Sequence, residues 1–137
     1  MSIESIDHVA LPIQKVDEVL SFYESVGFRI DTSFAPRLYS AHVGQQKINF
    51  HHPSLWKNSN FTLRGPMAKP GGGDLCFVWS GTANALERKL HSLSILTIEG
   101  PVERMGGRSF GSVMGKSYYV RDPDQNLIEF IIYPSED

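Results

Sequence analysis

The stretch Arg121-Asp122-Pro123-Asp124-Gln125-Asn126-Leu127-Ile128-Glu129-Phe130 joins a polar turn to an apolar strand that contains one carboxylate. Its last five residues share their pattern with Gln46-Lys47-Ile48-Asn49-Phe50, which also follow a turn. Both segments carry a polar residue at the fourth position, between isoleucine and phenylalanine. Asn49 and Glu129 are therefore expected at equivalent places in two related modules.

A second correspondence lies near the start of each module. His8 precedes Leu20 by twelve residues, and Asp74 precedes Leu86 by the same twelve residues. Both leucines belong to segments with helical periodicity, so His8 and Asp74 are predicted to be equivalent as well. The two matches together indicate an internal duplication.

Each module is predicted to be a βαβββ unit. In module one, short apolar runs predict strands at residues 6–13, 28–32, 40–43 and 47–51, with a helix from Val16 that ends at Gly27. In module two, the predicted strands are residues 74–79, a segment near Thr97, residues 117–121 and residues 127–133. A helix from about Thr82 is expected to bury the stripe Leu86, Leu90 and Leu93.

The fold class that follows is α+β, in one domain covering residues 1–137. Module one spans about 4–52, module two about 74–133, and the segment 53–73 between them is rich in proline and glycine and lacks a clear period. A pseudo-twofold arrangement of two such modules is expected to wrap their mixed sheets into a cup with the helices outside. Positions 8, 49, 74 and 129 would then converge.

Composition excludes several classes of function. Hydrophobic residues make up 41% of the 137 residues and charged residues 20%, which suits a folded core, and the formal net charge is -2. Because the sequence has no run of basic residues, nucleic acid is not expected as a partner. Because it has no stretch of about 20 successive apolar residues, a membrane is not expected either. The single cysteine, Cys76, allows no disulfide within the chain and is predicted to be a buried, inert thiol in a reducing cytoplasm.

The converging positions have the chemistry of a metal site. Histidine nitrogen with carboxylate oxygens suits Zn, Fe(II), Mn, Ni or Co, and three protein ligands leave positions for water and a chelating substrate. Glu129 lies in an apolar strand, where a cation partner offsets the cost of an unpaired carboxylate, although a salt bridge to an arginine is an alternative. Each of the other two candidates also has an alternative structural role. His8, considered by itself, could be a hydrogen-bonded histidine of the core, and Asp74, which follows three glycines, could cap a turn with its side chain.

The chain resembles the glyoxalase, bleomycin-resistance and extradiol dioxygenase superfamily, also called the vicinal oxygen chelate superfamily, over nearly its whole length. The segments that carry the resemblance are residues 6–11, Phe22-Tyr23, residues 74–77 and residues 121–129. Residues 47–51 and 74–77 are similar to small glyoxalase domain-containing, lactoylglutathione lyase-like proteins. The resemblance implies that the metal ligands of the superfamily correspond here to His8, Asp74 and Glu129.

Two positions depart from the pattern of the superfamily. Glyoxalase I enzymes place a carboxylate or glutamine where this chain has Asn49, and extradiol dioxygenases and fosfomycin thiol transferases typically place histidine at the position of Asp74. An amide is a poor base, so efficient glyoxalase I activity is not expected. His51 lies two residues beyond Asn49 on the same strand face, so it is a candidate fourth ligand or base.

Two further features concern substrate binding. The Tyr119 hydroxyl is a candidate for orienting a substrate, although tyrosine is also an ordinary strand residue. Residues 104–112 contain glycines and two arginines, and they are predicted to form a mobile lid over the cup that offers its arginines to an anionic substrate.

The sequence therefore predicts a metal-dependent lyase, isomerase or dioxygenase that acts on a small substrate with adjacent oxygens. The catalytic candidates are Glu129, His51 and Tyr119, and the metal candidates are His8, Asp74, Glu129 and His51. The alternatives are a small-molecule binding protein of the bleomycin-resistance kind without catalysis, and an enzyme relic kept as an interaction module. A homodimer is expected from the resemblance.

Overall fold

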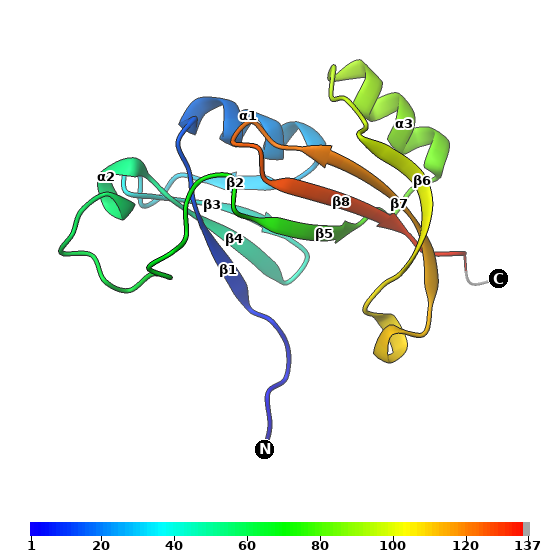
Figure 1. The fold of residues 1–137 in the computed structure, drawn as a ribbon, viewed down its shortest axis with the longest axis horizontal. Helices are drawn as coiled ribbons and strands as arrows, with labels where there is room; N and C mark the ends of the chain where they lie inside the picture. The colour runs from blue at the N-terminus through cyan, green and yellow to red at the C-terminus, as the bar shows by residue number, and fades with distance from the viewer. Residues whose placement is uncertain (136–137) are drawn as a thin grey trace. The chain divides into compact units, whose positions relative to one another are not determined.

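The fold was analysed in a computed structural model, which describes residues 1–135 (Figure 1). The chain divides into two compact units, the first comprising Met1–Gly72 and the second beginning at Gly73. Each unit has its own four-stranded mixed sheet. Each can therefore be described by itself.

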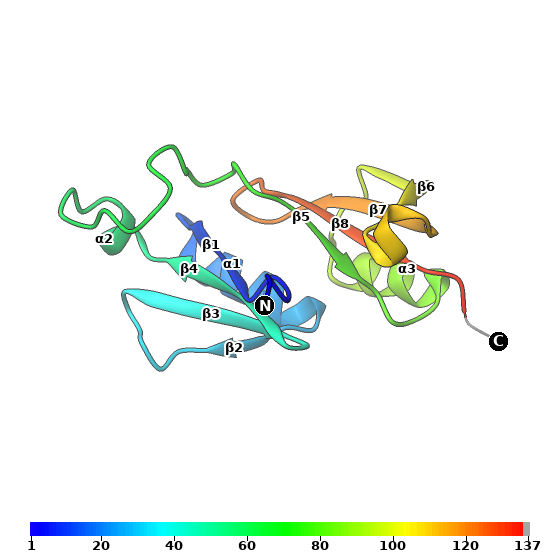
Figure 2. The same ribbon diagram turned by 90° about the horizontal axis from the view of Figure 1, so that it is seen from below.

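The first unit is a βαβββ module followed by a short helix. Its elements are β1 (His8–Pro12), α1 (Val16–Val26), β2 (Arg29–Asp31), β3 (Leu38–Val43), β4 (Gln46–His51) and α2 (Pro53–Trp56). The strand order is β1-β4-β3-β2, with β1 parallel to β4 and the remaining pairs antiparallel. Figure 2 shows α1 on one side of this sheet.

Helix α1 and the first sheet share an apolar core. Val19 and Tyr23 of α1 are fully buried, and the Tyr23 ring lies 5.0 Å from that of Phe50 on β4. The helix ends at Gly27, whose φ of 120° is a conformation that glycine adopts without a steric penalty. The predicted first helix is confirmed.

The second unit repeats the order. Its elements are β5 (Asp74–Val78), α3 (Ala83–Ser92), β6 (Glu99–Met105), a 3₁₀ turn (Arg108–Gly111), β7 (Met114–Arg121) and β8 (Leu127–Ile132). The order β5-β8-β7-β6 matches that of the first sheet, with β5 parallel to β8. The predicted α+β fold of two βαβββ modules is confirmed.

Helix α3 covers one face of the second sheet. Thr82 caps its N-terminus, because the Thr82 Oγ1 accepts a hydrogen bond from the Ala85 backbone N–H at 3.1 Å. Leu86 and Leu90 are buried as predicted, whereas Leu93 is the C-cap residue and is only half-buried. The helix ends one residue short of the third predicted core position.

The registers of the parallel strand pairs agree with the predicted duplication. His8 pairs with Lys47, which places Asn49 two residues further along β4 on the same face. Asp74 pairs with Leu127 in the same way, which places Glu129 two residues further along β8 on the same face. Asn49 and Glu129 therefore occupy equivalent positions in the two sheets.

Two segments of the fold differ from prediction. The predicted linker contains α2, which begins where the His52 Nδ1 accepts a hydrogen bond from the Ser54 backbone N–H at 3.0 Å. The strand expected near Thr97 begins at Glu99 and continues to Met105, so it includes the start of the predicted lid. It is an edge strand with a register shift around Pro101, where a missing backbone N–H is tolerated.

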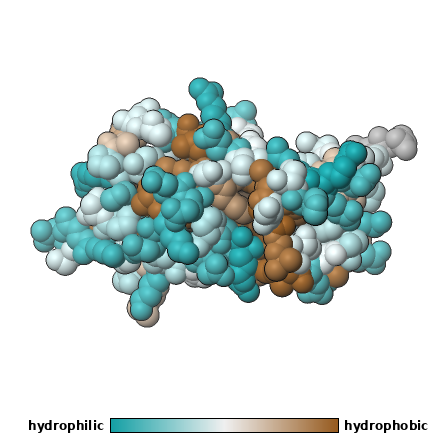
Figure 3. All heavy atoms as spheres, turned by 90° about the horizontal axis from the view of Figure 1, so that it is seen from above, coloured by the Kyte–Doolittle hydropathy of each residue, from teal (hydrophilic) through white to brown (hydrophobic). Residues whose placement is uncertain are grey.

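The outer surface is mainly hydrophilic with scattered hydrophobic patches on the face drawn in Figure 3. Leu96 and Ile98, which follow α3, are among the exposed apolar residues. Within the described residues, no helix has the length and apolar character needed to cross a membrane.

Candidate functional site

Strand register defines one polar face on the first sheet. Paired residues of neighbouring strands point to the same side, and alternate residues along each strand share that side. The residues on the face that carries His8 include His8 and Ala10 of β1, Lys47, Asn49 and His51 of β4, and Leu38, Ser40 and His42 of β3. Three predicted or candidate site residues therefore share this face.

His8 is exposed at the start of β1, and a neighbouring carboxylate orients it. The His8 Nδ1 lies 2.6 Å from the Asp7 Oδ1. This contact occupies Nδ1 and leaves Nε2 as the ring nitrogen that can bind a cation. A carboxylate on the second nitrogen is the usual way in which proteins orient a metal-binding histidine and raise its basicity.

Asn49 is held by the neighbouring strand. The Ser40 hydroxyl donates a hydrogen bond to the Asn49 Oδ1 at 2.8 Å, across the directly paired positions of β3 and β4. The amide oxygen, which is the only atom of this side chain able to bind a metal, already has a partner. Asn49 is therefore a fixed polar group on the face rather than a base.

His51 lies at the other end of the face from His8. His8 pairs with Lys47, and His51 lies four residues further along β4, or about 13 Å at the usual strand rise. Two ligands of one metal ion approach it to about 2.0–2.2 Å each, so this spacing disfavours His51 as a ligand of an ion held by His8. Both roles of His51, as a ligand and as a base, stay predictions.

The environment of His51 keeps its ring neutral. The residue is 9% exposed, and its ring meets that of Phe61 edge-on with centroids 5.3 Å apart. Burial lowers the pKa of His51 below its ordinary value, and the positive charge of Arg64 lowers it further. Near neutral pH, one ring nitrogen is therefore a donor and the other an acceptor.

The second sheet carries the acidic candidates on one face. The residues that share the face with Glu129 include Asp74, Cys76 and Val78 of β5, Leu127, Glu129 and Ile131 of β8, and Ser117, Tyr119 and Arg121 of β7. The Ser117 hydroxyl donates a hydrogen bond to the Glu129 Oε2 at 2.6 Å. Glu129 is half-buried and has no salt bridge to an arginine within residues 1–135, the alternative considered from sequence.

Asp74 is exposed at the start of β5, where backbone contacts fix its position. The preceding Gly73 donates its N–H to the Asn126 Oδ1 at 2.7 Å and accepts a hydrogen bond from the Leu127 N–H at 3.0 Å. Within the described residues, the Asp74 carboxylate caps no turn and makes no side-chain hydrogen bond. It is free to bind a cation or a ligand.

Cys76 differs from its prediction. The residue is exposed, because strand alternation turns the neighbouring Leu75 and Phe77 toward the other side of the sheet, on which α3 packs. The predicted buried position is therefore wrong. Desolvation of the thiol, followed by the charge of the adjacent Glu129, nevertheless raises the pKa of Cys76 to about 12, so the thiol stays protonated.

Tyr119 lies beside Glu129 and is oriented by an arginine that sequence reasoning placed in the lid. Tyr119 pairs directly with Glu129, and the Arg104 Nε donates a hydrogen bond to the Tyr119 hydroxyl oxygen at 3.1 Å. This bond is the main reason why the pKa of Arg104 is raised. Arg104 belongs to β6 rather than to a loop, and it adds a cation to this face.

The rest of the predicted lid is the connection between β6 and β7. The Arg108 guanidinium lies 4.3 Å from the centroid of the Tyr133 ring, a cation–π contact. Ser109 and Phe110 adopt positive φ angles, and the Phe110 side chain is fully exposed. Mobility of this segment stays a prediction.

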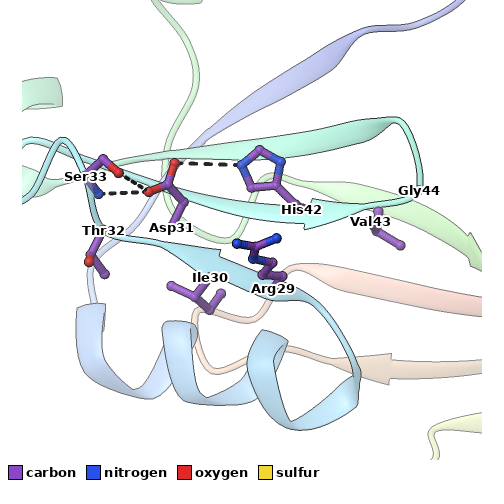
Figure 4. Close-up of a pocket in the computed structure, with 8 residues that line it drawn as sticks. All are labelled: Arg29, Ile30, Asp31, Thr32, Ser33, His42, Val43 and Gly44. Atoms are coloured by element: carbon purple, nitrogen blue, oxygen red, sulfur yellow. Dashed lines mark hydrogen bonds and ion pairs between the residues drawn. The ribbon is translucent and has the colours of Figure 1, made fainter.

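A cavity of about 750 Å³ lies at the edge of the first sheet, away from the predicted residues (Figure 4). Its wall includes Asp31, whose Oδ1 accepts hydrogen bonds from the Ser33 backbone N–H at 2.9 Å and hydroxyl at 2.6 Å. These bonds, the hydroxyl first, lower the pKa of Asp31. The Asp31 Oδ2 also lies 3.9 Å from the His42 Nε2 on β3.

The predicted metal ligands are divided between the two units, each of which is described by itself. The first presents an imidazole nitrogen, and the second presents two carboxylates. In the part of the chain that the structure describes, no three histidine, cysteine, aspartate or glutamate side chains lie close enough together to hold one ion. The donor chemistry fits a divalent cation, because His8 has an oriented ring and a free nitrogen and Asp74 has a free carboxylate.

Comparison with known proteins identifies the family. The chain is 34% identical over 133 residues to the glyoxalase domain-containing protein RDO1 of Mycosarcoma maydis, covering 97% of this chain and 70% of that protein. It is 37% identical over 134 residues to virulence protein STM3117 of Salmonella typhimurium, covering 97% and 87%. No family model matches the chain.

Solved structures agree with the sequence comparison. The crystal structure of virulence protein STM3117 matches with a TM-score of 0.84 and 35% identity, covering 98% of this chain and all of that one. A lactoylglutathione lyase from Agrobacterium tumefaciens shares the fold, with a TM-score of 0.71, 19% identity and coverage of 96% and 95%. The chain belongs to the glyoxalase, bleomycin-resistance and dioxygenase superfamily, and its relative RDO1 is a glyoxalase domain-containing protein.

Proposed function

We propose that this protein is a divalent-metal-dependent enzyme of the lyase, isomerase or dioxygenase type, acting on a small substrate with adjacent oxygen atoms. The proposed ligands of the cation are His8, Asp74 and Glu129. The observation that carries the proposal is the contact between Asp7 and the His8 Nδ1, because it orients an exposed ring for metal binding without serving any packing role.

A metal bound there would act as a Lewis acid on the oxygens of the substrate. The side chains of this protein then have separate tasks. His51 is neutral near pH 7 and can accept a proton, and the Tyr119 hydroxyl can donate a hydrogen bond because its oxygen already accepts one from Arg104. Ser117 holds one oxygen of Glu129 in place, which reduces the reorganisation needed on binding.

The test is elemental analysis of protein purified without added metal. His8→Ala and Glu129→Ala should each remove most of the bound metal while circular dichroism stays unchanged, because each removes a ligand from the exposed or half-buried part of a sheet. His42→Ala is the matched control, since His42 lies on the same face as His8 but outside the proposed ligand set. Full metal occupancy in both ligand variants would overturn the proposal.

The same measurement separates the proposed enzyme from a binding protein of the bleomycin-resistance kind. Protein that contains no metal and acquires none from solutions of Zn, Fe(II), Mn, Ni or Co would favour that alternative. A cytoplasmic homodimer remains our expectation for the state in which the enzyme works.

A further inference from the structure

A second cavity, of about 450 Å³, lies in the first unit at the His51 end of the polar face. It is bounded by the β2–β3 connection, β3, β4, α2 and the residues after α2. Its wall includes Phe34, Leu38, Leu55 and Phe61, together with the polar residues Arg37, Asn49 and His51. The volume falls within the range of pockets that bind small molecules.

The apolar side of this cavity is preformed. Leu55 is 6% exposed and lies in α2, a single helical turn that is fastened at both ends. At its start His52 caps the helix, and at its end the Trp56 Nε1–H donates a hydrogen bond to the Ile13 carbonyl at 2.9 Å. Phe34, by contrast, is 67% exposed at the open side, which leaves a large apolar ring uncovered.

The polar side of the cavity offers a group that lacks a partner. Within residues 1–135, no side-chain hydrogen bond of His51 is found, and its ring nitrogens are not among the fully buried atoms that lack a partner, so they reach the space of the cavity. A ring nitrogen that reaches the cavity can hydrogen-bond to a ligand atom there. On β4, Asn49 lies between His51 and Lys47, the residue that pairs with His8. The cavity therefore adjoins the end of the face that carries the proposed metal ligand His8.

The charges around the cavity have one sign. Arg37 lines it, and Arg64 is near enough to lower the pKa of His51 through its positive charge. The Arg64 Nε is also buried with no hydrogen-bond partner among the described residues. Because the lining contains no aspartate or glutamate, the cavity favours an anionic ligand over a neutral or cationic one.

We infer that this cavity binds an aromatic carboxylate, with the ring between Phe34 and Phe61 and the carboxylate at Arg37. This inference rests on the proposed function, since it names the substrate class of the same face: a small aromatic acid whose remaining polar group hydrogen-bonds to His51. The aromatic walls supply affinity, and the arginine supplies the preference for an anion.

The experiment uses the full-length protein stripped of metal with a chelator, titrated with benzoate, benzamide and acetate. Binding is followed by calorimetry and by the ring NMR signals of His51, which are assigned from their loss in His51→Gln. Benzoate should bind and shift the His51 signals, whereas benzamide, which lacks the charge, should bind about tenfold more weakly or worse. Acetate, which lacks the ring, should not shift them.

Variants test the two halves of the cavity separately. Phe61→Leu and Arg37→Gln should each weaken benzoate binding by about tenfold, since each removes one of the two recognition contacts. His42→Gln is the matched control, because His42 lies at the other cavity of the same unit and should leave benzoate binding unchanged. The more drastic Phe61→Ala is avoided, because Phe61 also contacts His51.

Three results would overturn the inference: benzoate without effect on His51, benzamide bound as tightly as benzoate, or full affinity retained in Arg37→Gln. Because the protein is free of metal in this experiment, its failure is distinct from that of the proposed function. A protein that holds metal through His8 and Glu129 but ignores benzoate would refute only the substrate class.

Discussion

The turn between β7 and β8 provides a sharp test of how the second unit is held together. Asp122 is 1% exposed, and its Oδ1 accepts hydrogen bonds from the backbone N–H groups of Asp124 at 2.9 Å and Asn126 at 3.0 Å. Its Oδ2 accepts a third from the Asn126 Nδ2 at 2.8 Å. Asn126 in turn accepts from the Gly73 N–H, so one pair of side chains connects this turn to the start of β5.

Exchanging the two side chains should preserve this connection, whereas changing either alone should break it. The Asp122→Asn side chain keeps one oxygen that can accept from the two backbone N–H groups. Its new amide group, however, faces the Asn126 amide group, so two hydrogen-bond donors meet where a donor met an acceptor. In Asn126→Asp, two buried carboxylates face each other at the position of the hydrogen bond that measures 2.8 Å in the parent protein, so they repel each other. In the double variant the bond is re-formed with its direction reversed, and an oxygen at position 126 still accepts from Gly73.

The expected magnitudes follow from the loss of a charge-assisted hydrogen bond. Such bonds contribute about 1.5–3 kcal/mol, and each single variant also leaves a buried polar group unpaired, so each should lower the free energy of unfolding by about 3 kcal/mol. With a urea m-value of about 2 kcal/mol/M, the midpoint falls by about 1.5 M. The double variant should recover to within about 1 kcal/mol of the parent.

The assay must report on the second unit alone. The chain has two tryptophans, Trp56 in the first unit and Trp79 in the second, so in a Trp56→Phe background the tryptophan fluorescence comes from the second unit alone. Urea unfolding of the parent, the two single variants and the double variant then completes a double-mutant cycle. A double variant that loses the sum of the two single losses would show that this hydrogen bond does not couple the residues, and the reasoning would be refuted.

Three further predictions concern the first unit and the assembly. Because the pKa of His51 is lowered in the folded chain, the unfolded chain protonates first as the pH falls below about 6.5; stability should drop until the folded pKa is passed. His51→Gln should flatten this decline in urea titrations, and an unchanged slope would contradict it. The wild type should turn over the methylglyoxal–glutathione hemithioacetal at well below about 10 per second, because Asn49 is not a base. Asn49→Glu, which keeps the Ser40 hydrogen bond, should be faster, and efficient wild-type turnover would count against this reasoning. Light scattering at micromolar concentration should show a species of twice the chain mass; a 15.3 kDa species alone would argue against the homodimer.

Sequence pattern was sufficient for the elements whose residues alternate or repeat strongly. The strand around Ile128 and Phe130 and the helix with Leu86 and Leu90 were predicted because burial imposes a period of two or of about 3.6 on them. Helix α2 was missed because a single turn is too short to show a period, and its cap is a histidine rather than one of the usual capping residues.

The partners of the candidate residues were harder to predict, because they come from other strands. The contact between Ser40 and Asn49 could have been predicted from the β3–β4 hairpin. Once the turn pairs Val43 with Gln46, the antiparallel register pairs Ser40 with Asn49. The contact of Arg104 was not accessible, since the glycines of residues 104–112 predicted a mobile lid, whereas β6 continues through Arg104 to Met105. Whether His8, Asp74 and Glu129 share an ion depends on chemistry that no local pattern contains.

The equivalent positions of the two modules carry different chemistry, which has an evolutionary consequence. Where the first module has a histidine and an amide, the second has two carboxylates. A chain made of two first modules would offer His8 and Asn49 twice and no negative charge at these positions, whereas two second modules would offer four carboxylates and no imidazole. Neither duplicate would reproduce the mixed donor set that we propose, so the duplication predicted from the sequence requires the two halves to have diverged into parts that cannot replace each other.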